Sequence, residues 1–162
     1  MYGRAARSRY RAGVSSARAR RSDFGALLVL VYGFFAFAAG ARSLYQLATD
    51  FDEAPLPILL SVVAAGVYLV ACSQIGKSTP RAWRITMAVC SFELAGVLIV
   101  GTLSLLESDW FPRATVWSDF GIGYGFMPLV LPIAGLIWLT RPATRRRFGL
   151  DEATPAVGSA PA

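Results

Sequence analysis

The stretch ITMAVCSFELAGVLIVGTLSLL, residues Ile85–Leu106, is apolar or small-residue along its whole length except for one formal charge, the carboxylate of Glu93. A helix that crosses a bilayer needs about 20 predominantly apolar residues. Three further stretches have no charge at all: Gly25–Ala41, Ala54–Gly76 and Gly121–Thr140. Together they predict an all-α fold of four transmembrane helices, at about residues 25–48, 56–76, 85–106 and 121–140.

The overall composition also favours a membrane protein. Of the 162 residues, 55% are hydrophobic and 16% are charged, and the mean hydropathy is +0.50. A soluble domain usually has about a quarter charged residues. A soluble four-helix core would also need a polar outer face on every helix, whereas these four stretches are apolar all round.

The loops alternate in charge. Basic residues gather in residues 1–22, in the loop between the second and third stretches, and after the fourth; acidic residues gather in the other two loops, at Asp50, Asp52, Glu53, Glu107, Asp109 and Asp119, against Arg113. Because basic loops stay in the cytoplasm during insertion, we expect both termini to be cytoplasmic. The predicted location is therefore the cell membrane, in a multi-pass four-helix bundle.

This reading divides the chain into three parts. Residues 1–22 and 142–162 are expected to be disordered cytoplasmic tails, the first basic and the second basic only at its start. Residues 23–141 form the transmembrane domain. A cleaved signal peptide is the alternative for the first span, but its apolar stretch continues through Tyr45. The basic tail could also attract nucleic acid or anionic lipid. We expect it only to fix topology, with no nucleic-acid partner.

Residue types limit the chemistry. The chain has no histidine and two cysteines, Cys72 and Cys90, both inside predicted spans. A histidine-based nucleophile system is excluded. No metal site, disulfide or cofactor is expected. The spans offer no second carboxylate to work with Glu93 in acid–base catalysis, so we expect no catalytic residues and no enzyme.

Glu93 is the candidate site within the membrane. It lies about 12 Å from the inner end of its span at 1.5 Å per residue. A charge at that depth costs at least about 2.5–3.5 kcal/mol, so Glu93 should face the bundle interior. Small and polar residues share its helix face, namely Thr86, Cys90, Gly96, Val97 and Ser104.

Other polar residues could join Glu93 in an intramembrane cluster. Tyr68, at mid-depth in the second span, is a plausible hydrogen-bond partner. On the first span, Arg42 shares a face with Tyr45 and Gln46. Arg42 could approach Glu93, or its side chain could extend to the outer surface instead. Aromatic residues mark the interfaces: Trp83 and Trp138 on the inner side, and Trp110, Phe111, Trp117 and Phe120 on the outer side.

Two motifs suggest functions that their context does not support. GIGYGF, Gly121–Phe126, resembles a potassium-channel filter, but Gly121 stands where the filter has threonine, and the preceding loop is too short for a pore helix. The outer carboxylates of TDFDEAP lack the spacing of an EF-hand loop. We expect neither a channel filter nor a calcium site.

Three segments give the chain a pattern-level resemblance to a known group: ARSLYQLATDFDEAPL, FELAGVLIVGTLSL and GYGFMPLVLPIAGLIWL. With them the chain resembles small uncharacterised four-span integral membrane proteins of actinobacteria. The resemblance covers roughly residues 25–141 and implies a membrane location and topology, with no activity attached.

The functional expectation follows from these points. We expect a non-enzymatic accessory or interaction subunit, whose polar cluster serves helix or partner packing. Its partners would be the lipid bilayer and either another membrane protein or further copies of the chain. The alternative is a small oligomeric transporter or proton-linked carrier that uses Glu93, because ionisable residues inside membranes often mark such pathways.

Overall fold

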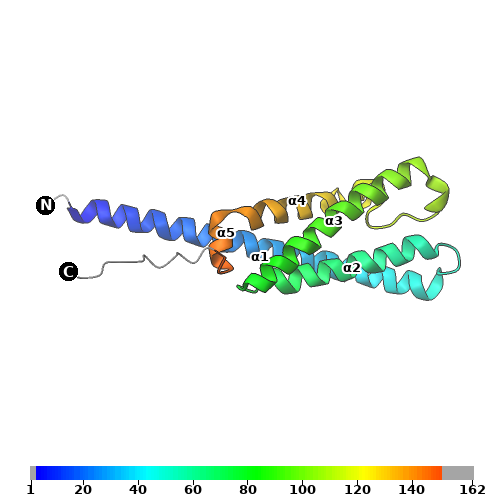
Figure 1. Cartoon of the computed structure of the whole chain (residues 1–162), viewed down its shortest axis with the longest axis horizontal. Helices are drawn as coiled ribbons and strands as arrows, with labels where there is room; N and C mark the ends of the chain where they lie inside the picture. The colour runs from blue at the N-terminus through cyan, green and yellow to red at the C-terminus, as the bar shows by residue number, and fades with distance from the viewer. Residues whose placement is uncertain (1–2, 151–162) are drawn as a thin grey trace, which may run out of the picture.

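The computed structural model describes residues 3–150, with side chains from Phe24 onward. The described chain is helical, and it has no strand: α1 (Gly3–Thr49), α2 (Pro55–Ile75), α3 (Pro80–Leu106), the short 3₁₀ segments η1 (Ser108–Trp110) and η2 (Ser118–Tyr124), α4 (Met127–Thr140) and α5 (Pro142–Arg147). In Figure 1, α1 to α4 run along the long axis of the molecule, and α5 turns across the end of α4. The all-α prediction is confirmed.

Local sequence signals explain where the helices begin. Proline stands in the first turn of α2, α3, α4 and α5, where its missing N–H leaves no hydrogen bond unmade. Thr79 caps α3, because its side-chain oxygen accepts from the backbone N–H of Ala82 at 3.2 Å. The interior of each helix is apolar, so the helices are held mainly by the contacts between them.

Three helices are long and apolar enough to cross a membrane: Phe24–Thr49 within α1, α2 and α3. A fourth candidate exists only if η2 and α4 count as one span, and these two are bent by 99°. Length and composition thus support three membrane-spanning helices, or four when the bent pair of η2 and α4 counts as one span.

The fourth stretch differs from the straight helix expected over residues 121–140. Only Met127–Thr140 is α-helical there, and the residues before it turn through left-handed backbone at Asp119, Phe120, Gly121 and Phe126. A side chain on Gly121, at φ +81°, would meet the Pro128 ring at 2.8 Å. Gly121 and Gly125, both at positive φ, permit the turn, which comes before Pro128.

The two ends also differ from expectation. Residues 3–22 were expected to be disordered but continue α1, in keeping with the high helix propensity of alanine and arginine. The basic segment after Arg141 forms α5, and Phe148 behind it is fully buried. The predicted disorder of residues 151–162 lies outside the described residues.

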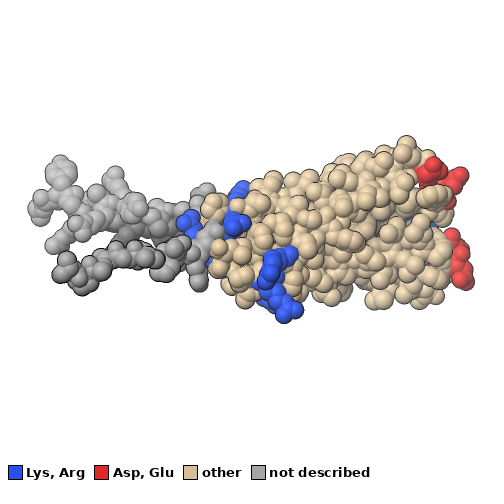
Figure 2. Space-filling view, viewed as in Figure 1, with Lys and Arg blue, Asp and Glu red and all other residues tan. Residues whose placement is uncertain are grey.

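The helices pack in an order that brings distant segments together. α1 lies mainly against α2, while α3 lies against α2, α4 and η2. At the acidic end, Arg113 joins two loops, with its guanidinium 3.0 Å from Asp50 and 2.6 Å from Glu53. Figure 2 shows Lys and Arg gathered toward one end of the described molecule and Asp and Glu at the other.

Candidate functional site

Glu93 lies at the centre of the molecule with no exposed surface. The hydroxyl of Tyr32, on α1, donates a hydrogen bond to Glu93 Oε2 at 3.0 Å. The helix face predicted for Glu93 is confirmed, because Thr86, Cys90 and Val97 are buried with it. The carboxyl therefore links α3 to α1 in the interior of the protein.

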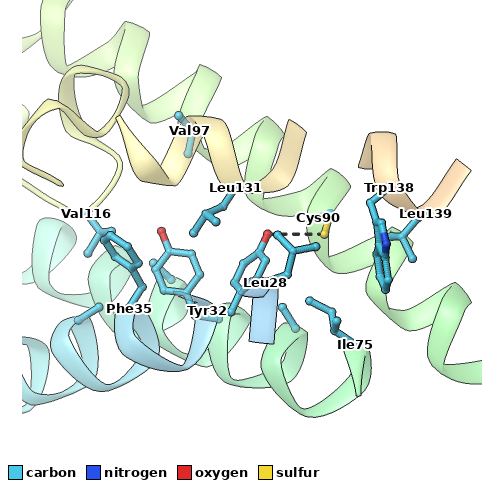
Figure 3. Close-up of a cluster of buried hydrophobic side chains, with 14 of the residues drawn as sticks. Leu28, Tyr32, Phe35, Ile75, Cys90, Val97, Val116, Leu131, Trp138 and Leu139 are labelled. Atoms are coloured by element: carbon cyan, nitrogen blue, oxygen red, sulfur yellow. Dashed lines mark hydrogen bonds between the residues drawn. The ribbon is translucent and has the colours of Figure 1, made fainter. Parts of the chain in front are cut away.

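The same tyrosine also reaches the next turn of α3. Its hydroxyl lies 3.7 Å from Cys90 Sγ, as the dashed line in Figure 3 marks. α4 closes over this contact at Gly135, where a Cβ would lie 3.0 Å from the sulfur and 3.8 Å from the tyrosine oxygen. Three helices approach one another closely here because Gly135 has no side chain.

α2 contributes Tyr68, which is fully buried beside the pair. Its ring centre lies 6.0 Å from that of Tyr32 and 6.1 Å from that of Phe35. The hydroxyl of Tyr68 is close enough to interact electrostatically with Glu93 and Trp117. It makes no hydrogen bond of good geometry with either. The structure thus brings Tyr68 beside Glu93, as expected, without the bond itself.

Three buried polar atoms in this region have no hydrogen-bond partner: Glu93 Oε1, the Tyr68 hydroxyl and Trp117 Nε1. Most buried polar groups in proteins are paired, because an unmade bond costs about 1–3 kcal/mol. The three atoms have complementary roles. An indole N–H only donates, a hydroxyl donates and accepts, and an ionised carboxylate only accepts.

Trp117 belongs to a segment that the sequence did not mark as interior. It was expected at the outer interface, but the structure buries it to 2% exposed. Its indole lies against Gly96, where a Cβ would meet the ring at 2.9 Å. Gly96 follows Glu93 by one turn of α3. Trp117 therefore covers the Glu93 region from the acidic end of the molecule.

The segment around Trp117 forms a turn that is stabilised by hydrogen bonds within the segment. The backbone N–H of Thr115 donates to Ser118 Oγ at 2.9 Å, and the N–H of Ser118 donates to Thr115 Oγ1 at 2.9 Å. Val116, Trp117 and both hydroxyl residues are buried. The reciprocal pair Thr-x-x-Ser and the glycine one turn from Glu93 are the sequence signals that could have indicated this insertion.

Arg42 does not reach Glu93. Its guanidinium donates to the Tyr124 hydroxyl at 2.9 Å and to the carbonyl oxygen of Ala114 at 3.5 Å. It also lies 6.0 Å from the centre of the Tyr124 ring. Holding a cation near such polar partners is less costly than burying it at mid-depth. The alternative in which Arg42 turns outward is the arrangement that the structure has.

The two remaining candidates lie apart from the cluster. Tyr45 is 67% exposed, and Gln46 is buried near the C-terminal end of α1. Of the five residues proposed from sequence, the structure brings Glu93 and Tyr68 together. It adds Tyr32 and Trp117, which the sequence pattern did not single out, and Cys90, which was expected only on the same helix face as Glu93.

The chemistry available to this cluster is narrow. It contains one carboxyl, two phenols, one thiol and one indole, all without access to solvent. Among residues 24–150, no group of three or more His, Cys, Asp or Glu side chains is arranged to hold a metal ion. The arrangement can hold helices in register through polar contacts and can keep or release a proton at Glu93.

A hollow of about 420 Å³ lies between α1 and α2, on their outward face. Small and apolar residues line it: Gly33, Ala36, Phe37, Gly40, Leu44, Val62, Ala65, Gly66 and Leu69, with Ser43 as the polar member. Ser43 is buried, and its Oγ has no hydrogen-bond partner. The hollow is thus an apolar recess with one unused polar atom.

The chain was also compared with protein families, curated proteins and solved structures. No family model, no curated protein and no solved structure matches it. Its function is therefore inferred from its own residues.

Proposed function

We propose that the chain is a four-span α-helical protein of the cell membrane, with both termini in the cytoplasm, that acts as a non-enzymatic accessory subunit. In this proposal it binds a transmembrane helix of another membrane protein. The observation that carries the proposal is the apolar hollow between α1 and α2.

The contacts at the basic end support four spans. Trp83, near the start of α3, donates from Nε1 to the carbonyl oxygen of Leu139 at the end of α4, at 3.0 Å. The α4 terminus therefore lies beside the α3 start, as an outward α3 and an inward fourth span require. The separation of charge between the two ends supports the orientation, with the basic end inside (Figure 2).

The lining of the hollow supports a helical partner. Small residues let two helix backbones approach closely in a membrane, where packing replaces the hydrophobic effect as the driving force. Gly33, Ala36 and Gly40 recur at helical spacing along α1, and Ala65 and Gly66 face them from α2.

The enclosed cluster around Glu93 supports a rigid scaffold behind this surface. Polar contacts between membrane helices contribute about 0.6 kcal/mol each on average, and they fix which turns face each other. The bond from Tyr32 to Glu93 fixes the register of α1 against α3, and the Tyr68 ring, with its centre 6.0 Å from that of Tyr32, packs α2 against the same point. The hollow between α1 and α2 then keeps its shape.

A substitution at Gly66 tests the proposal directly. A Cβ at Gly66 would meet nothing within 4 Å, so Gly66→Leu fills the hollow without disturbing the fold. We expect the wild-type protein, gently extracted from its own membrane, to have a native mass that includes a second, different chain. Gly66→Leu should lose that chain.

Gly123→Leu is the matched control, because Gly123 has the same open surroundings and lies outside the hollow. It should keep the partner. A wild-type protein that purifies alone or only with itself contradicts the proposal. So does an unchanged complex in Gly66→Leu.

A second candidate function, a proton-linked carrier, is favoured by the three unpartnered atoms near Glu93. A carboxyl next to an unpartnered hydroxyl can exchange its proton when the surroundings rearrange. Proton flux into liposomes containing the purified protein tests this. Glu93→Gln should abolish flux and leave the assembly state unchanged. Equal flux with Gln excludes this function.

A further inference from the structure

The basic end of the molecule carries a surface that the proposed function does not use. Six of its cationic side chains are exposed, three at the α2–α3 connection and three around α5: Lys77, Arg81, Arg84, Arg141, Arg146 and Arg147. We call these six residues the basic collar. Within residues 24–150, the acidic residues other than buried Glu93 belong to the loops at the opposite end (Figure 2). Among the described side chains, the collar therefore carries charge of one sign.

The collar is built on an ordered platform. The chain turns at Arg141, with extended backbone at φ −65° and ψ 136°, and Pro142 begins α5. Thr144 and Phe148, one turn apart, are buried. The Phe148 ring packs edge-on against Trp138 with centres 6.0 Å apart. These contacts fix α5 across the end of α4, so its cations are held at a defined depth.

Two tryptophans lie at that depth, of which Trp83 is partly exposed and Trp138 is buried. Trp83 and Trp138 are among the residues at this end, and each has a guanidinium over its ring: Arg145 at 5.7 Å and Arg147 at 5.8 Å. Tryptophan favours the level of the lipid headgroups, because its ring is apolar and its N–H is polar. A guanidinium stacked on such a ring still presents N–H donors at its edge.

From this juxtaposition we propose that the basic collar binds the phosphate groups of anionic phospholipids. The charges are complementary, and guanidinium matches phosphate with paired hydrogen bonds. Trp83, whose ring is partly exposed, sets the collar at the level where those phosphates lie. The occupant is a lipid rather than a free anion, because the bilayer presents its phosphates at this level in high concentration.

Tryptophan quenching by brominated lipids tests the proposal. In a Trp110→Phe/Trp117→Phe background, the emission comes from Trp83 and Trp138, both beside the collar. Brominated phosphatidylglycerol in nanodiscs should quench this emission at a lower mole fraction than brominated phosphatidylcholine. The ratio of the two gives the preference for the anionic lipid. Each positive charge removed should lower this ratio roughly fivefold.

Arg81→Gln/Arg146→Gln removes two exposed collar charges, and Arg42→Gln/Arg113→Gln removes two charges at the other end. Only the first double variant should lose the preference. Arg81→Lys/Arg146→Lys should keep most of it and shows that folding is intact. An equal quenching by both lipids in the wild type overturns the proposal, as does an equal loss in the two Gln variants. A last control adds inorganic phosphate, or sodium chloride of equal ionic strength, to the wild type. If only inorganic phosphate abolishes the preference for the anionic lipid, the collar binds a soluble anion, and the proposal is also overturned.

Discussion

The hydroxyl of Tyr32 and the carboxyl of Glu93, 61 positions apart in sequence, meet at 3.0 Å in the interior of the protein. Neither residue has exposed surface. This bond supplies the buried carboxylate with a donor that the rest of α3 does not offer. It also places α1 and α3 in register at the same depth, so it has a structural consequence whether or not Glu93 exchanges protons.

Tyr32→Phe should therefore destabilise the protein. The substitution keeps the ring and removes the donor, leaving Glu93 Oε2 buried without its partner. Polar contacts in membrane proteins contribute about 0.6 kcal/mol on average, with a maximum near 1.7 kcal/mol. We expect a loss of about 0.6–1.7 kcal/mol in unfolding free energy, measured by denaturation in bicelles. Tyr45→Phe, at an exposed ring, should change little. Equal effects in the two variants contradict this role for Tyr32.

Gly96→Ala should cost stability through Trp117. The new Cβ would lie 2.9 Å from the indole ring, which is itself held between buried neighbours and a fixed turn. Overpacking of this kind costs about 1–3 kcal/mol, and it exceeds the gain of about 1 kcal/mol from replacing glycine in a helix. Gly66→Ala meets nothing within 4 Å and should show only the gain. If Gly96→Ala is as stable as Gly66→Ala, Trp117 does not pack where the structure has it.

The sequence was sufficient for some of these features and not for others. The buried face of α3 follows from helical spacing and from the cost of a charge in lipid, so Thr86, Cys90 and Glu93 could be grouped in advance. Tyr32 could not be assigned to Glu93, because their contact depends on how two helices dock. Periodicity within one helix carries no such information.

The segment between α3 and α4 shows a second limit of prediction from sequence. An aromatic residue in a loop between two spans is normally an interface anchor, and Trp117 was interpreted that way. Its burial depends on left-handed backbone at Asp119 and Phe120 and on the space left by Gly96. An analysis of hydropathy alone does not detect these features. The same geometry turned the expected straight fourth helix into a bent pair.

The ion pairs of Arg113 with Asp50 and Glu53 give a prediction about the effect of pH and salt on stability. Its hydrogen bond to Glu53 and its attraction to Asp50 raise the pKa of Arg113 above its usual value. Because the folded pKa is raised, the stabilisation is present below the ordinary pKa of arginine and is lost only as the pH rises above it. The stability difference between wild type and Arg113→Gln should thus stay constant from about pH 7 to about pH 10.

That same difference should shrink when salt is added, because the pair is partly exposed and screened. Chemical denaturation of both proteins at low and high sodium chloride measures it. A difference that vanishes between neutral and alkaline pH is incompatible with a charged guanidinium bridging two carboxylates. A difference that persists unchanged in high salt assigns the effect to packing instead.

The close approach of α4 to α3 can be tested as a coupling between Gly135 and Cys90. A Cβ on Gly135 would lie 3.0 Å from Cys90 Sγ, so Gly135→Ala should destabilise the protein by about 1–3 kcal/mol. Cys90→Ala removes the sulfur and opens that space. Gly135→Ala should therefore cost less in the Cys90→Ala background than in the wild type. A double-mutant cycle on unfolding free energy measures the coupling, which should be at least about 0.5 kcal/mol for residues in contact. Additive effects would mean that α4 does not pack over the Tyr32–Cys90 contact, and that the bent pair does not close the Glu93 region from that side.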